Sequence, residues 1–91
     1  MDKSFKKYVK EQVYLRTGQK PDIYYEPRLN IYDRVKMVIE FLPIVIHIVN
    51  DESYWLSVIA CKDTECYNYR VSPDELYNTI DYIIDKWYPG G

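Results

Sequence analysis

The feature that most restricts the fold of this 91-residue chain is an apolar stretch in its middle, from Met37 to Val49. Only Glu40 and His47 interrupt this stretch with ionisable side chains. A helix needs about 20 apolar residues to cross a bilayer, so the stretch is too short to span a membrane. It therefore predicts a buried core segment, an interface, or both.

Downstream of Leu42 the sequence predicts three strands, at 44–49, 54–61 and 66–71, separated by turns at 50–53 and 62–65. Four-residue turns would set Val49 opposite Tyr54 and Cys61 opposite Cys66 in an antiparallel sheet. Opposed residues share a face. One face is then expected to carry Ile44, Ile46, Ile48, Trp55, Ser57, Ile59, Cys61, Cys66, Asn68 and Arg70. This face has more apolar surface than a solvent-facing sheet should present.

Two amphipathic helices are expected at the ends of the chain. Residues 5–16 carry an apolar stripe at helical spacing, formed by Phe5, Tyr8, Val9 and Val13. Near the C-terminus, Ser72, Pro73 and Glu75 have the spacing of a capping box at the start of a helix. The expected buried stripe of that helix is Leu76, Ile80, Ile83, Ile84 and Trp87.

The segment between the first helix and the apolar stretch has two parts. Pro21 and Pro27 favour an extended strap over 19–29. Residues 30–42 fit both a helix, capped by Asn30 and stopped by Pro43, and a strand with alternating apolar residues; we favour the helix.

The expected fold is therefore a single α+β domain over 1–91. A three-stranded antiparallel sheet is flanked by an N-terminal and a C-terminal amphipathic helix, with an extra helix or strand at 30–42. Residues 1–15 lack the apolar core of a signal peptide, and no membrane span is found, so a cytoplasmic location is expected.

The composition is skewed, with eleven tyrosines and a single alanine, Ala60. In this respect the chain resembles small orphan proteins of hyperthermophilic archaea and their viruses. The resemblance implies a thermostable archaeal or viral protein, located in the host cytoplasm if viral.

Few residues offer a chemical site. Cys61 and Cys66 are a disulfide candidate, with two buried thiols as the alternative. His47 is the only histidine, and a zinc site needs about four ligands, so no metal and no cofactor is predicted. A catalytic pair of His47 and Cys61 is disfavoured because the predicted register places them on opposite faces.

The favoured function is that of a non-catalytic interaction protein that forms a homodimer and binds a protein partner, for example as a viral modulator of a host complex. Ile46, Trp55, Ile59 and Arg70 are the expected contact residues because aromatic and arginine side chains are enriched at interfaces. No membrane or small-molecule partner is predicted.

The alternative is nucleic-acid binding by the N-terminal part. Residues 1–36 carry nine Lys or Arg against five Asp or Glu, a net charge of +4, whereas residues 37–91 carry −6. The candidate binding residues are Lys3, Lys6, Lys7, Lys10, Tyr24 and Tyr25, supplemented by Arg16, Lys20, Tyr8 and Tyr14. An overall pI of about 5.3 argues against this function. A small enzyme that uses His47 with a carboxylate is the third hypothesis.

Overall fold

The computed structural model describes residues 3–26, 36–50 and 54–89. In chain order the elements are α1 (Lys3–Thr17), β1 (Asp22–Tyr25), β2 (Lys36–Phe41), β3 (Ile44–Asn50), β4 (Leu56–Lys62), β5 (Glu65–Val71), the 3₁₀ turn η1 (Pro73–Glu75) and α2 (Leu76–Trp87). The strands form one antiparallel sheet in the order of the sequence, β1-β2-β3-β4-β5. The expected α+β class is confirmed, but the sheet has five strands rather than three.

The two extra strands come from the segment between α1 and β3. Part of the expected strap is β1, whose extended geometry agrees with the prediction. The helix that we favoured over 30–42 is wrong for residues 36–41, which form β2; residues 30–35, including the expected cap Asn30, lie outside the described residues. Residues 36–41 form a strand because their backbone groups pair with β1 on one side and with β3 on the other. Phe41 pairs with Ile44 across the turn at Leu42 and Pro43, and the peptide bond between these two turn residues is cis.

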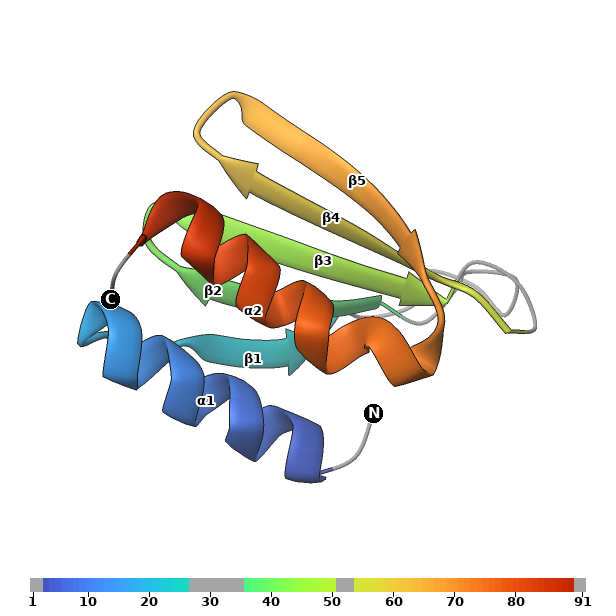
Figure 1. Ribbon diagram of the computed structural model, residues 1–91, viewed down its shortest axis with the longest axis horizontal. Coiled ribbons are helices and arrows are strands. Elements are labelled where there is room, and N and C mark those ends of the chain that lie inside the picture. Colours follow the sequence, from blue (N-terminus) through green and yellow to red (C-terminus); the bar gives the residue numbers. More distant parts are fainter. Residues whose placement is uncertain (1–2, 27–35, 51–53, 90–91) are drawn as a thin grey trace.

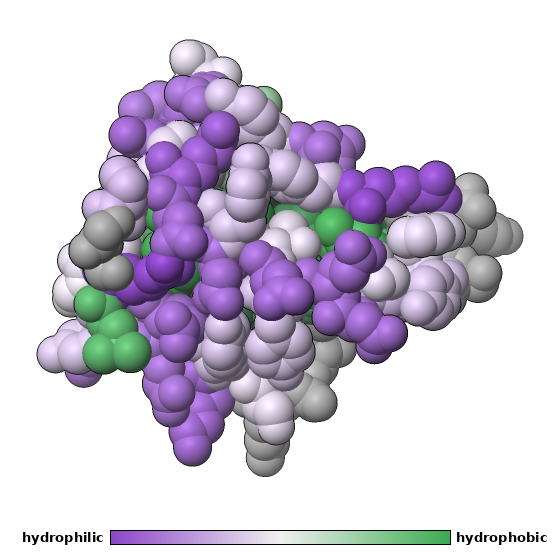
Figure 2. All heavy atoms as spheres, in the orientation of Figure 1, coloured by the Kyte–Doolittle hydropathy of each residue, from purple (hydrophilic) through white to green (hydrophobic). Residues whose placement is uncertain are grey.

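Helices α1 and α2 pack on the same side of the sheet, which we call the covered face (Figure 1). The core on this face combines the two helix stripes with alternate strand residues. Its buried members are Phe5, Val9, Val13, Met37, Ile39, Phe41, Ile44, Ile46, Ile48, Leu56, Val58, Ala60, Val71, Leu76, Ile80, Ile83 and Ile84. Figure 2 shows that the outer surface over the helices presents mainly polar side chains. Both predicted amphipathic helices are therefore confirmed.

The predicted register of β3 and β4 is wrong. Asn50 pairs with Leu56, whereas the expected four-residue turn would have paired Val49 with Tyr54. The difference is three positions, and an odd shift exchanges the two faces of the strands relative to each other. Ile46 consequently pairs with Ala60 on the covered face. Opposite lies the open face, on which no described helix packs; it carries Val45, His47, Val49, Ser57, Ile59 and Cys61.

The predicted register of β4 and β5 is confirmed. Cys61 lies opposite Cys66, with 4.1 Å between their Cα atoms, and the two form a disulfide. Such a short separation is typical of a non-hydrogen-bonded pair in an antiparallel ladder. Of the two states open from the sequence, the structure contains the disulfide.

The start of the last helix also follows the prediction. The backbone N–H of Ser72 donates to Glu75 Oε1 (3.1 Å), and the Ser72 hydroxyl donates to the same oxygen (2.9 Å). Both hydrogen bonds favour the ionised carboxylate, so they lower the pKa of Glu75. The capping box thus directs the chain from the edge strand β5 back across the covered face.

Candidate functional site

The C-terminal end of α1 determines where the chain turns back toward the sheet. The Gly18 N–H donates to the Tyr14 carbonyl (2.9 Å), and Gly18 has a φ of 76°, the left-handed conformation in which helices often end at glycine. Gln19 Nε2 donates to the Leu42 carbonyl (2.8 Å), which ties this connection to the β2–β3 turn. The next residue, Lys20, is therefore held beside α1.

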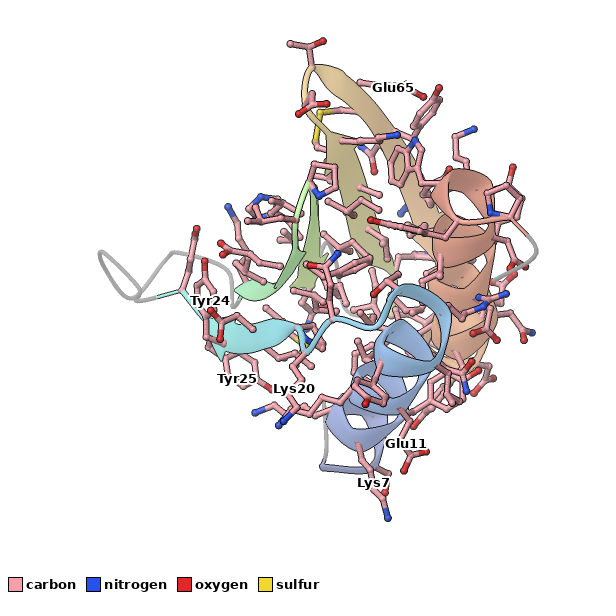
Figure 3. The ribbon with its side chains drawn as sticks, turned by 90° about the vertical axis from the view of Figure 1, so that its left-hand side faces the viewer. Lys7, Glu11, Lys20, Tyr24, Tyr25 and Glu65 are labelled. Atoms are coloured by element: carbon pink, nitrogen blue, oxygen red, sulfur yellow. A yellow bond between two sulfur atoms is a disulfide. The ribbon has the colours of Figure 1, made fainter. Side chains whose placement is uncertain are left out.

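A groove of about 520 Å³ lies between α1 and the start of β1. Its lining consists of Lys10, Glu11 and Tyr14 from α1, and of Lys20 and Pro21 from the connection. We call it the α1–β1 groove. Pro21 is buried and forms an apolar part of the lining, whereas the two lysines are exposed. Figure 3 shows Lys20 next to β1 and Glu11 on α1.

A lysine–tyrosine pair also joins α1 to β1. Lys6 Nζ lies 4.9 Å from the centroid of the Tyr25 ring. Tyr25 pairs with Met37 and therefore points to the helix side of the sheet. Lys7 is exposed on α1 (Figure 3), and the Tyr14 side chain is 55% exposed. Two lysines and one tyrosine thus line the groove, and the Lys6–Tyr25 pair joins the same two elements.

Two other candidate nucleic-acid-binding residues, Tyr8 and Arg16, face α2 instead. The Tyr8 hydroxyl donates to Asp81 Oδ2 (2.6 Å), and this hydrogen bond raises the pKa of Tyr8 to about 12. Arg16 forms an ion pair with Asp85 and donates to the Asp81 carbonyl (3.3 Å). These contacts hold the two helices together and are not part of the groove.

Tyr24 points away from the groove, because successive residues of a strand point to opposite faces. Its hydroxyl donates to Glu40 Oε1 (2.5 Å), which raises the pKa of Tyr24 to about 12. The side chain of Lys3 lies outside what the structure describes. Of the six residues first proposed for nucleic-acid binding, the structure therefore brings Lys6, Lys10 and Tyr25 to this side of the molecule, with Lys7 nearby on α1.

The lysines around the groove form no ion pair with a described carboxylate. Over the described ranges, ion pairs join Arg16 to Asp85 and Lys36 to Glu26, and none involves a groove lysine. Glu11 is the one acidic residue among the described residues that line the groove. An anion in the groove would meet two flanking ammonium groups and the edge or face of an exposed tyrosine.

The residues expected to form a sheet-face interface do not all lie together. Ile46 is fully buried in the core, so its expected place in an exposed interface is wrong. Trp55 is 39% exposed, and the Arg70 guanidinium lies 5.3 Å from the centroid of its ring. Ile59 is half-buried on the open face. Of the four expected contact residues, Trp55 and Arg70 therefore lie together, and Ile46 belongs to the core.

His47 and Cys61 share the open face, so the prediction that they lie on opposite faces is wrong. The Cys61 sulfur is bonded to Cys66 and offers no thiolate nucleophile. His47 Nδ1 is buried with no hydrogen-bond partner among the described residues. The described part of the chain also contains no cluster of three or more His, Cys, Asp or Glu side chains arranged for a metal ion.

Sequence reasoning missed two residues of the groove, Glu11 and Pro21. Their proximity depends on β1 lying alongside α1, which no local pattern indicates. A usable signal was proximity in sequence: Lys20 and Pro21 follow shortly after the expected helix that carries Lys10, Glu11 and Tyr14.

None of the described helices is long and apolar enough to span a membrane. No family model, curated protein sequence or solved structure is significantly similar to this chain.

Proposed function

We propose that the protein binds single-stranded nucleic acid through the α1–β1 groove. The observation that carries the proposal is the convergence of Lys10, Lys20 and the exposed Tyr14 ring on one concave surface, extended by the Lys6–Tyr25 pair. Lysines that track phosphates, together with tyrosines on which bases stack, are the ingredients of single-strand recognition.

Stacking favours a single strand over a duplex. A tyrosine ring can stack only on a base whose face is free, and bases in a duplex are already stacked on each other. The Tyr14 side chain is exposed enough to stack on a base, and the buried Pro21 forms an apolar part of the same groove lining. Base identity is not read in this arrangement, so little sequence preference is expected.

The acidity of the whole chain does not prevent this function. Two acidic residues of α2 that face α1 are already engaged: Asp85 forms an ion pair with Arg16, and the Asp81 carboxylate accepts a hydrogen bond from Tyr8. Charges farther away than about 8 Å are largely screened at physiological ionic strength. The local excess of lysine at the groove then determines the attraction for phosphates.

The test is fluorescence anisotropy with labelled 12-nucleotide single strands and with the matching duplex. We expect single strands to bind more tightly than the duplex. Tyr14→Ala should weaken single-strand binding about tenfold because one stacking platform is lost, whereas Tyr14→Phe, the matched control, keeps the ring and should bind like the wild type. Absence of binding at tens of micromolar protein in low salt, or equal loss in both variants, would contradict the proposal.

A protein partner at the open face is the second candidate. It is favoured by Trp55, which is partly exposed, contacts Tyr54 edge to face at 5.5 Å between ring centroids and carries Arg70 on its ring. Capture of a protein after nuclease treatment, lost in Trp55→Ala and retained in Tyr14→Ala, would favour this candidate over nucleic-acid binding.

A further inference from the structure

The strand β5 forms one edge of the sheet, and no described strand lies beyond it (Figure 1). It is seven residues long, and Glu65, Cys66, Tyr67 and Asn68 are exposed. An edge strand presents unpaired backbone donors and acceptors that can pair with another strand.

The register shows which backbone groups point outward. Lys62 and Glu65 close the β4–β5 hairpin across two residues, and such a turn places a hydrogen bond between them. Hydrogen-bonded and non-hydrogen-bonded pairs alternate along the ladder, so Cys61 and Cys66 form a non-hydrogen-bonded pair. Their short Cα–Cα distance of 4.1 Å agrees. The N–H and C=O groups of Cys66, and by the same alternation those of Asn68 and Arg70, therefore point away from β4.

β5 lacks several devices by which natural edge strands prevent pairing. It contains no proline and no lysine, and its residues pair without interruption with β4 from Glu65 to Val71. Its two charged residues, Glu65 and Arg70, lie near its ends, and the Arg70 guanidinium lies over the Trp55 ring.

We propose that β5 pairs with β5 of a second copy of this chain, antiparallel and centred on Asn68, to give a continuous ten-stranded sheet. In a two-fold antiparallel pair the central residue opposes itself, and Asn68 is the middle residue of β5 and has outward-pointing backbone groups. This register overlaps all seven residues. It also places Cys66 opposite the partner's Arg70 as a second hydrogen-bonded pair.

The side chains suit this register. On the covered face Tyr67 would oppose the partner's Tyr69, in a position where side chains of opposed residues lie closest. Both rings are already held in place by α2, since Tyr67 lies 6.0 Å from Trp87 and Tyr69 lies 5.8 Å from Tyr82 between ring centroids. Glu65 would oppose the partner's Val71, so no like charges oppose each other. A second copy is thus a better fit than an arbitrary strand.

The first test is sedimentation analysis of the full chain from 1 to 100 μM, a range set by the roughly micromolar affinity typical of a modest interface. We expect a species with twice the 11.0 kDa mass of one chain. Asn68→Pro removes an N–H that points away from β4, so it should leave the monomer folded and weaken dimerisation by about tenfold or more. Asn68→Thr keeps the N–H and is the matched control that should remain dimeric.

A cross-linking test reports on the register itself. Hydrogen-bonded pairs have Cα atoms about 5.5 Å apart, within the range that a disulfide bridges, so Asn68→Cys should form a covalent dimer on oxidation. Thr64→Cys is the control, because in this register its two copies would be about 26 Å apart. A wild type that stays monomeric at 100 μM, a dimer unaffected by Asn68→Pro, or equal cross-linking of the two cysteine variants would each overturn the proposal.

Discussion

The salt dependence of single-strand binding gives a quantitative test of the α1–β1 groove. Lys10 and Lys20 line the groove, Lys6 contacts Tyr25, and Lys7 is exposed on the same helix; none of these four lysines forms an ion pair with a described residue. If each neutralises one phosphate, the slope of log affinity against log salt is about −2.8, from about −0.7 per phosphate on a single strand. Raising the salt from about 50 to 200 mM should then lower the affinity about 50-fold.

Replacing two of these lysines should halve the slope. In the double variant Lys10→Gln/Lys20→Gln the expected slope is about −1.4, and the same change of salt should cost only about sevenfold. Anisotropy titrations at four salt concentrations give both slopes. The control Lys62→Gln/Lys86→Gln removes the same net charge from positions that do not line the groove and should keep the wild-type slope. If both double variants changed the slope equally, binding would depend on overall charge, and the assignment to this groove would be refuted.

Three further predictions concern the fold and use chemical denaturation. Ile46→Ala should lower the free energy of unfolding by about 2–5 kcal/mol because the side chain is fully buried. Ile59→Ala, on the open face, should lower it by less than about 1.5 kcal/mol because this side chain is only half-buried. A larger loss in Ile59→Ala than in Ile46→Ala would contradict the observed register. The pKa of Tyr8 is raised to about 12 from 10.0, so the stability that its hydrogen bond to Asp81 contributes is complete below pH 10 and is lost as the pH rises toward 12. The fall in the free energy of unfolding at alkaline pH should be smaller in Tyr8→Phe, and an unchanged fall would show that this hydrogen bond does not stabilise the fold. Reduction of the disulfide between Cys61 and Cys66 opens a six-residue loop and should cost about 2 kcal/mol; a denaturation midpoint that does not respond to reductant would show that the link is absent or irrelevant.

Local signals were sufficient wherever the structure depends on neighbours in sequence. The capping box of Ser72 and Glu75 and the buried stripe ending near Ile84 need only helical spacing, and both were predicted correctly. The pairing of Cys61 with Cys66 depends on one short turn, and it too was predicted.

The register of β3 and β4 could not be obtained in the same way. Apolar residues occupy both faces of this region, with Ile46 and Ile48 on one and Val45 and Ile59 on the other. Alternation therefore fails to indicate which face is buried, and the assumed turn length alone decided the register. Since α1 and α2 cover only one face, the packing of the helices selects the isoleucines of β3 for the core.

Predicting the α1–β1 groove would have required knowledge of the tertiary structure. The charge count indicated a basic N-terminal part, but the candidate binding residues chosen there included Arg16, which forms an ion pair with Asp85 of α2, and Tyr24, which lies on the opposite face of the sheet. Lys10 and Lys20 line one groove because β1 adds to the edge of the sheet next to α1. The pairing of β1 with β2 was not recognised in the sequence, and so neither was the groove.

The sequential strand order also has a consequence for how the chain is made. Each strand pairs with the one synthesised just before it, so the sheet can assemble from short loops, which favours rapid folding. Helix α1 is synthesised before the five strands and α2 after them, yet the two helices contact each other: Tyr8 and Asp81 are 73 positions apart, and Arg16 and Asp81 are 65 apart. During translation, the hydrogen bonds from Tyr8 and Arg16 to α2 can therefore form only after the whole sheet has been synthesised.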